Sequence, residues 1–177
     1  MDQPVRLADS LTDGEIILDS YRIEDVDDHM RGEDEEMLRR FGSPHRPTRE
    51  QTLVAIKRWI DARRAGGPMF AYALRQPSGL LMGGCEIRVL SRERAAVSYW
   101  IYPEFRNRGY ATRAITLLAN HAAQIDGLRQ LEAHVDADNL ASRRLAEKAG
   151  FVEAGAVTDE EAGTISKRVL YLRHLGL

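Results

Sequence analysis

The spacing of apolar side chains in the second half of the chain changes from strand-like to helix-like and back. Residues 95–102 form an apolar-rich run that is typical of a buried strand. Residues 130–135 alternate between apolar and polar side chains, as in a half-buried strand. Between these runs the apolar positions recur every three or four residues, and this spacing predicts a helix with one buried face. The positions on that face are Ala111, Ala114, Ile115, Leu118, Ala122 and Ile125.

The first half begins with short elements and then a longer helix. Residues 15–21 are predicted to form a strand and residues 24–30 a short acidic helix. Thr48 and Gln51 have the spacing of a capping box, in which each side chain bonds the backbone amide of the other residue. A helix is therefore predicted to start after Thr48, and it ends by Gly66, where Gly-Gly-Pro follows.

A hairpin and two final elements complete the pattern. Residues 70–75 and 80–90 are apolar runs separated by Gln-Pro-Ser-Gly, a composition that favours an antiparallel turn. Residues 139–149 have the features of a helix closed by a glycine, and residues 167–174 those of a terminal strand. Strands that are first antiparallel and then cross over through helices imply a mixed α+β or α/β sheet with helices on its faces.

Length and composition narrow the class of protein. A chain of 177 residues fits one domain, here predicted over residues 14–177 after an N-terminal arm of residues 1–13. Lys plus Arg number 25 against 27 Asp plus Glu, so no basic field indicates nucleic acid. No apolar stretch has the length of a membrane span or a signal core. The single cysteine, Cys85, forms no internal disulfide and favours the cytoplasm.

Residues 106–111, Arg-Asn-Arg-Gly-Tyr-Ala, connect a predicted strand to a predicted helix and carry the clearest chemistry. Free amides and the dipole at a helix N-terminus attract an anion, and Gly109 lets the backbone approach a phosphate. Arg106 and Arg108 add charge-assisted donors. A surface loop with two arginines would account for the same residues. The sequence lacks the glycine-rich motifs of dinucleotide and Walker-type sites, so those phosphate cradles are disfavoured.

The pattern Arg106-x-x-Gly109-x-Ala111 resembles the Arg/Gln-x-x-Gly-x-Gly/Ala motif of the GCN5-related N-acetyltransferases, the GNAT family. The flanking blocks at residues 98–104 and 138–151 resemble the same family, with most likeness to its RimJ/RimL-like, ribosomal-protein-alanine acetyltransferase branch. The resemblance implies a mostly antiparallel sheet that splays at its middle and is flanked by helices. It also implies acetyl-CoA as co-substrate, with the pantetheine arm lying in the gap of the sheet. Direct acetyl transfer requires no metal, and none is expected.

The resemblance carries over to particular residues. Ile101 and Tyr102 are expected to contact the pantetheine arm through their backbone, and Asn139 through its side chain. Ser142 is the hypothetical acid that protonates the departing thiolate. For Asn139 a helix N-cap is the alternative interpretation. The residues expected around the pyrophosphate are Arg106, Asn107, Arg108, Gly109, Tyr110, Ala111 and Thr112.

The general base is the point at which this sequence departs from the family pattern. Relatives often have glutamate on the strand before the pyrophosphate loop, where this chain has Ala96. Glu86, on the neighbouring predicted strand, is the best substitute, although an outward-facing, solvated Glu86 is an alternative. Glu153 ranks below it. Cys85 is interpreted as a buried filler rather than an acyl-accepting nucleophile.

Other polar and aromatic groups have ordinary interpretations. His134, Asp136 and Asp138 alternate at a strand end, and we interpret them as turn and capping residues rather than metal ligands. Trp59 and Trp100 are expected to pack in the core.

The acceptor is less well defined than the donor. Residues 24–36 are rich in Asp and Glu and suit a cationic amine, but the arginines that follow compensate their charge. A protein N-terminus, a polyamine or a small-molecule amine all fit direct acetyl transfer. The competing hypotheses are a non-catalytic acyl-CoA-binding module that lost its base and, with no positive signal, an interaction protein that docks through its acidic block. Nothing in the sequence indicates whether the chain forms a homodimer.

Overall fold

The computed structural model describes residues 7–43, 45–161 and 164–176, and within them eight strands form one open sheet. Their order across the sheet is β1-β2-β3-β4-β5-β6-β8-β7, and every neighbouring pair is antiparallel except β5 and β6. This confirms the mixed, mostly antiparallel sheet. The strands are β1 (Ser10–Thr12), β2 (Ile17–Asp19), β3 (Met69–Arg75), β4 (Leu81–Val89), β5 (Arg94–Ile101), β6 (Gln130–Asp136), β7 (Val152–Glu161) and β8 (Thr164–His174).

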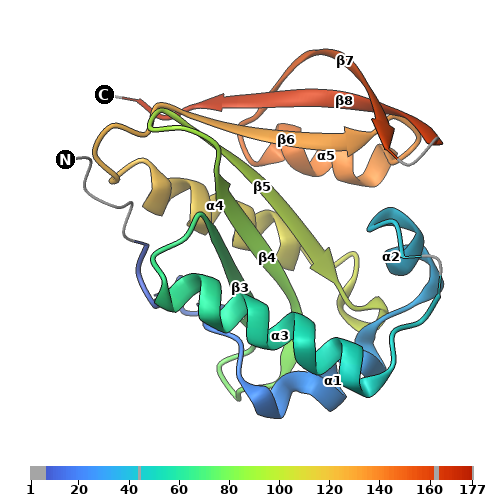
Figure 1. Cartoon of the computed structure of the whole chain (residues 1–177). Helices are drawn as coiled ribbons and strands as arrows, with labels where there is room; N and C mark the ends of the chain where they lie inside the picture. Colours follow the sequence, from blue (N-terminus) through green and yellow to red (C-terminus); the bar gives the residue numbers. More distant parts are fainter. Residues whose placement is uncertain (1–6, 44, 162–163, 177) are drawn as a thin grey trace.

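Helices cover both faces of this sheet (Figure 1). One face carries α1 and α3, which pack on β3 and β4. The other face carries α4 and α5, whose alanines and leucines join the larger core with β5 and β6. In the described residues no helix is both long and apolar enough to span a membrane. The helices are η1 (Ile23–Asp25), α1 (Val26–Gly32), α2 (Glu35–Arg40), α3 (Arg49–Arg64), η2 (Pro103–Phe105), α4 (Tyr110–Ala122) and α5 (Leu140–Lys148).

Among the strand pairs in the middle of the sheet, the parallel pair of β5 and β6 has the fewest paired residues. β5 and β6 pair through Arg94 with Gln130, Ala95 with Leu131 and Ala96 with Glu132, and then diverge. Figure 1 shows β6, β8 and β7 swinging away from β3, β4 and β5 as one group. The rest of β5 stays paired with β4 on its other side as far as Ile101. A strand edge is therefore left unpaired inside the molecule.

Local sequence signals explain several element boundaries. Thr48 accepts from the amide of Gln51, and the Gln51 side chain accepts from the amide of Thr48, so the capping box at the start of α3 is confirmed. Gly109, in the left-handed region at φ 80°, immediately precedes α4. The Asn139 side chain caps α5.

Three described elements had no clear signal in the hydrophobic pattern. β7 is exposed along most of the part whose burial is described, so its side chains show no apolar alternation. α2 has only six residues, although Asp34 caps it by accepting from the amide of Met37. The predicted N-terminal arm contains β1, which pairs with β2, and Leu7, which is buried in the larger core. Residues 1–6 of that arm lie outside the described residues.

A smaller, largely aromatic core lies between α1, α3 and the sheet, and His29 is buried in it. The ring of His29 is edge-on to Trp59, with ring centres 5.6 Å apart, and its Nδ1 lies 2.7 Å from the Tyr102 hydroxyl. Burial lowers the pKa of His29 to about 4. The imidazole is therefore neutral in the folded protein at neutral pH. Trp59 and Trp100 stack in this core at 5.5 Å, which fits their interpretation as packing residues.

The neutral His29 makes the stability of the fold sensitive to acid. An unfolded histidine takes up a proton near pH 6.5, whereas folded His29 resists protonation down to about pH 4. The contribution of His29 to the free energy of unfolding is thus nearly constant above pH 6.5, and it becomes destabilising as the pH falls below that value. We expect His29 to account for a loss of about 2 kcal/mol between pH 7 and pH 5. Urea unfolding of the wild type and His29→Gln at both pH values checks this, and equal losses in the two proteins would refute it.

Candidate active site

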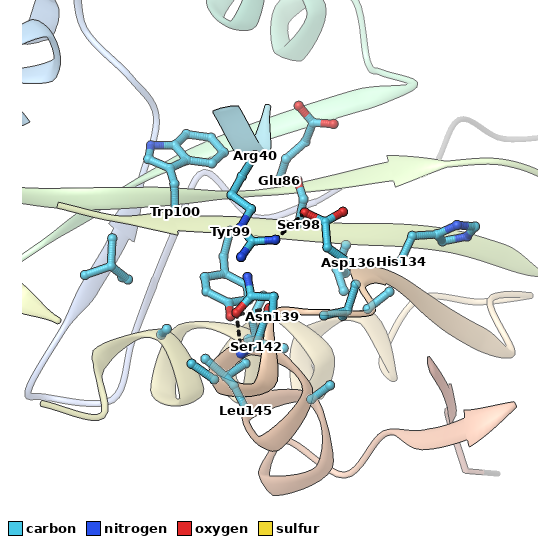
Figure 2. Close-up of a pocket in the computed structure, with 18 of the residues that line it drawn as sticks. Arg40, Glu86, Ser98, Tyr99, Trp100, His134, Asp136, Asn139, Ser142 and Leu145 are labelled. Carbon is cyan, nitrogen blue, oxygen red and sulfur yellow. Dashed lines mark hydrogen bonds and ion pairs between the residues drawn. The ribbon is translucent and has the colours of Figure 1, made fainter. Parts of the chain in front are cut away.

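A cleft of about 1180 Å³ opens where β5 and β6 diverge. Its walls are the free part of β5, the end of β6 and the first turns of α4 and α5. Arg40, the last residue of α2, and Phe41, which follows it, lie at one side. Figure 2 shows this arrangement, with Tyr99 and Ser142 meeting on one side of β5 and Glu86 pointing away on the other side. The alternation of strand side chains thus gives the cleft two chemically different faces.

The N-terminus of α4 forms one end of the cleft and presents free backbone donors. Asn107 and Gly109 both have positive φ, 60° and 80°, and this turn leads directly into the helix. In the part of the chain that the structure describes, the amides of residues 108–112 have no hydrogen-bond acceptor. The Arg108 side chain is exposed and makes no ion pair with a described residue. Free amides, a helix dipole and one available guanidinium form an anion site.

Arg106 has a different position from the neighbouring residues of this loop. Its guanidinium makes two hydrogen bonds with the Asp34 carboxylate, at 2.6 and 2.8 Å, and its Nε donates to the carbonyl of Ile101 at 3.0 Å. These contacts lower the pKa of Asp34 and raise that of Arg106. Arg106 therefore joins the end of β5 to the start of α2, and its charge is already paired before any anion binds.

The backbone of β5 offers hydrogen bonds to the cleft at alternate residues. The amide of Tyr102 donates to Met82 on the β4 side at 2.9 Å, so it is not available to a pantetheine arm. Ile101 points the opposite way, and its carbonyl already accepts from Arg106. By the same alternation, the groups left for a ligand are the amide of Ile101, the backbone of Tyr99 and the carbonyl of Val97, since the pairing of Ala96 with Glu132 uses the Val97 amide. A polar chain lying in the cleft can pair with this edge as an added strand.

Asn139 and Ser142 lie on the α5 side of the cleft. Asn139 accepts from the amide of Ser142 at 3.1 Å, which is the N-cap geometry that was the alternative interpretation of this residue. The capping bond uses the side-chain oxygen of Asn139, and the side-chain amide nitrogen is left for another partner. The Ser142 hydroxyl lies 2.7 Å from that of Tyr99. Burial raises the pKa of Tyr99, so its hydroxyl keeps its proton and can donate.

Glu86 lies on the opposite face, next to Ser98, its partner in the β4–β5 pair. Its side chain is 12% exposed and one carboxylate oxygen accepts from Arg88 at 3.0 Å. It is thus neither solvated nor free, and only its second oxygen remains for a substrate. Glu153 pairs with Arg143 at 3.1 Å and does not line the cleft. Cys85 is fully buried, which raises its pKa to about 12 and fits an unreactive filler.

Arginines neutralise much of the acidic block at residues 24–36. Asp25 is buried and makes two hydrogen bonds with Arg75, Asp27 pairs with Arg49, and Asp34 pairs with Arg106. The block therefore contributes more to holding α1 and α2 than to attracting a cation. In the described residues no group of three His, Cys, Asp or Glu side chains is arranged to hold a metal.

Two contacts of the site had no signal in the sequence. The Tyr99–Ser142 hydrogen bond joins residues 43 positions apart, and Arg40 of α2 reaches Asp136 at 2.8 Å and Asp138 at 2.6 Å. Arg40 thereby connects α2 to the end of β6 across the cleft. Both contacts depend on how the sheet divides, which local spacing does not predict.

The same chain segment matches a known family. Residues 15–152, well over half of the chain, match the family described as an acetyltransferase (GNAT) domain. The chain belongs to the GNAT acetyltransferase family. A curated relative, the uncharacterized N-acetyltransferase YoaA of Bacillus subtilis (strain 168), is 26% identical over 125 residues, which cover 70% of this chain and 71% of YoaA.

Solved structures share the fold of this GNAT chain. RimL, a ribosomal alpha-N-protein acetyltransferase in complex with coenzyme A, superposes with a TM-score of 0.80 and 17% identity, over 90% of this chain and 94% of RimL. The self-immunity acetyltransferase MccE, in complex with acetyl-CoA and AMP, superposes with a TM-score of 0.79 and 16% identity, over 93% of this chain and 98% of MccE. The splayed sheet is therefore the GNAT fold.

Family membership makes the protein an acyltransferase that uses acetyl-CoA as its acetyl donor. The described residues fit that co-substrate. Free amides and Arg108 at the start of α4 suit a pyrophosphate, and the unpaired edge of β5 suits an amide-containing arm. These are features of the chain itself and do not depend on the relatives.

Two glycines allow the α4 anion site to be tested against a matched control. Gly109 and Gly79 have φ values of 80° and 91°, and an added Cβ has no atom within 4 Å at either position. Valine should therefore strain both backbones similarly. Only Gly109→Val should weaken acetyl-CoA binding, by about tenfold or more, because its branched side chain lies at the free amides. Isothermal titration measures the affinity for acetyl-CoA. Equal affinities in the two variants would contradict an anion site at the start of α4.

Proposed function

We propose that this GNAT enzyme transfers the acetyl group of acetyl-CoA directly to a primary amine. The supporting observation is that one cleft joins the anion site at α4, the unpaired edge of β5 and the hydroxyl pair of Tyr99 and Ser142. An extended donor that follows this path brings its thioester between β5 and β6. The amine then approaches from the face that carries Glu86, Ser98 and Trp100 (Figure 2).

The chemistry divides between the two faces. The incoming ammonium loses one proton to become a neutral amine, which attacks the thioester carbonyl. The amine then gives up a second proton, both protons finally pass to solvent, and the C–S bond breaks as the tetrahedral intermediate collapses. The Ser142 hydroxyl, hydrogen-bonded to Tyr99, lies on the donor face and supplies a proton to the departing sulfur. Glu86 contacts the incoming ammonium through its free oxygen. The buried Cys85 takes no part in this direct transfer.

The proposed acceptors are a protein N-terminus, a polyamine or a small-molecule amine. RimL is an alpha-N-protein acetyltransferase, and MccE binds AMP together with acetyl-CoA, so this fold accepts chemically distinct partners. On the acceptor face of this chain, Glu86 and Asp136 offer carboxylates and the ring of Trp100 offers an apolar surface. This combination suits an amine attached to an apolar or aromatic group.

The experiment that tests the function follows thiol release from acetyl-CoA with three acceptor sets: N-terminal peptides, polyamines and aromatic or aliphatic primary amines. We expect turnover with at least one set and an acetylated amine of the corresponding mass. Acetyl-CoA binding without turnover in any set would contradict the proposal and favour the acyl-CoA-binding module. Absence of binding would contradict both.

Removing the hydroxyl at Ser142 should slow the chemical step and leave binding intact. For Ser142→Ala we expect a fall in kcat of about tenfold, at the low end for general acids because a thiolate leaves readily. The KM for the amine should not change. Steady-state kinetics measure both constants, and Tyr99→Phe should show a smaller effect of the same kind. Leu140→Ala, exposed on the same helix, is the control. An unchanged kcat in Ser142→Ala would exclude the proton-donor role.

A further inference from the structure

The end of the cleft where β5 and β6 are still paired contains two polar side chains, Glu132 and His134, and the sequence interpretation assigned only His134 to turn chemistry. Glu132 and His134 project from β6 on one face, whereas Leu131, Ala133 and Val135 project from the other face into the larger core. Glu132 is opposite Ala96 in the last residue pair before β5 and β6 diverge. His134 comes two residues later, beyond the split. Both line the cleft on the face that also carries Glu86 and Ser98.

Glu132 is a buried carboxylate with incomplete hydrogen bonding. Its side chain is 9% exposed, and its Oε1 has no hydrogen-bond partner among the described residues. The Arg94 guanidinium lies 3.6 Å from Oε1, and Nε2 of His134 lies 3.5 Å from Oε2. A buried carboxylate in this position favours a proton on the histidine nitrogen that faces it. The other nitrogen, Nδ1, then carries the lone pair.

The other acidic side chains that line the cleft are less suited to accept a proton. Glu86 is hydrogen-bonded to Arg88, and Asp136 is hydrogen-bonded to Arg40. Glu36 is 57% exposed and lies within 4 Å of both Arg40 and Arg106. His134 is the one histidine among the lining residues, and its side chain is 34% exposed, so it can exchange protons with water. Histidine is the side chain whose charge changes most readily near neutral pH.

The thioester must lie near this end of the cleft. The donor's phosphates belong at the start of α4, beyond Ile101, and the free edge of β5 runs from Ile101 back to Val97. At a rise of about 3.3 Å per residue this edge is about 13 Å long. An arm that follows the edge ends beside Val97 and Ala96, next to Glu132. Because the side chain of Ala96 is only a methyl group, it leaves space between the end of the arm and the side chains of Glu132 and His134.

We infer that His134 is the general base that deprotonates the acceptor amine, with Glu132 as its positioning residue. This inference rests on the proposed transfer to an amine. The N–H bond of the attacking amine breaks, a new N–H bond forms at Nδ1, and the resulting imidazolium is paired with Glu132. The proton then passes to solvent, while the departing sulfur receives its proton from the hydroxyl pair on the opposite face.

The test compares His134→Gln and His134→Ala with the wild type in thiol-release kinetics, using the best amine from the acceptor screen. We expect kcat to fall about 100-fold at pH 7, with unchanged acetyl-CoA affinity. The loss should shrink as the pH rises, because the amine then loses its proton without help. Added imidazole should restore part of the activity of His134→Ala. His174→Gln, an exposed histidine on β8, is the matched control and should retain full activity.

Glu132→Gln separates the positioning role from a structural one. We expect kcat to fall about tenfold and the acidic limb of the pH profile to move to lower pH, because the imidazolium loses its negative partner. Glu132→Asp should restore part of the activity. The charged side chains on the same face of β4, β5, β6 and β8, which remain unchanged in this variant, are Glu86, Arg88, Arg94, Asp136 and Arg168.

The outcomes distinguish this inference from the proposed function. If the wild type turns over and the kcat of the His134 variants stays within about twofold of the wild-type kcat across the pH range, the inference is overturned. The proposed function then remains intact. No wild-type turnover with any amine would overturn both. If the His134 variants do not fold, the Glu132→Gln profile decides, since an unshifted acidic limb would also overturn the inference.

Discussion

The division of the sheet after three paired residues of β5 and β6 is the constraint on which the site depends. An unpaired strand edge inside a protein is costly, because its amides and carbonyls have lost water without gaining partners. Here the cost is limited because the gap is a cleft that is open to solvent rather than a closed core. The groups that a continuous sheet would have used are left for a ligand. The pairing of β4 with β5 and of β6 with β8 remains intact on either side.

Side chains, more than backbone, connect the two halves of the divided sheet. Arg40 extends from α2 to Asp136 and Asp138, and the Tyr99 hydroxyl reaches Ser142 on α5. Arg106 fixes α2 to the end of β5 through Asp34. Each of these contacts includes a charged group or a short hydroxyl pair, and such bonds are stronger and more directional than apolar packing. They set the relative position of the side chains that line the cleft, across a gap that no backbone ladder spans.

Local signals in the sequence predicted most elements, because their causes lie within a few residues. The capping box at Thr48 and the glycine before α4 are of this kind. β7 was missed because an exposed edge strand needs no apolar alternation. The anion loop was recognisable from its residue types, but the pairing of Arg106 with Asp34 joins positions 72 residues apart. The proximity of Glu132 to Ala96 likewise appears only when the strand order is known.

In the proposed reaction, the two faces of β5 separate donor recognition from acceptor recognition. Tyr99 and the start of α4 belong to one face, whereas Ser98 and Trp100, together with Glu86 of β4 and the residues of α1 and α3, belong to the other. With the acceptor on the second face, as proposed, a substitution there would alter which molecule is acetylated without moving a group that holds the donor. Gene duplication followed by drift on that face alone would yield enzymes with new substrates and an unchanged coenzyme. A designer who wishes to redirect this scaffold would vary the same face.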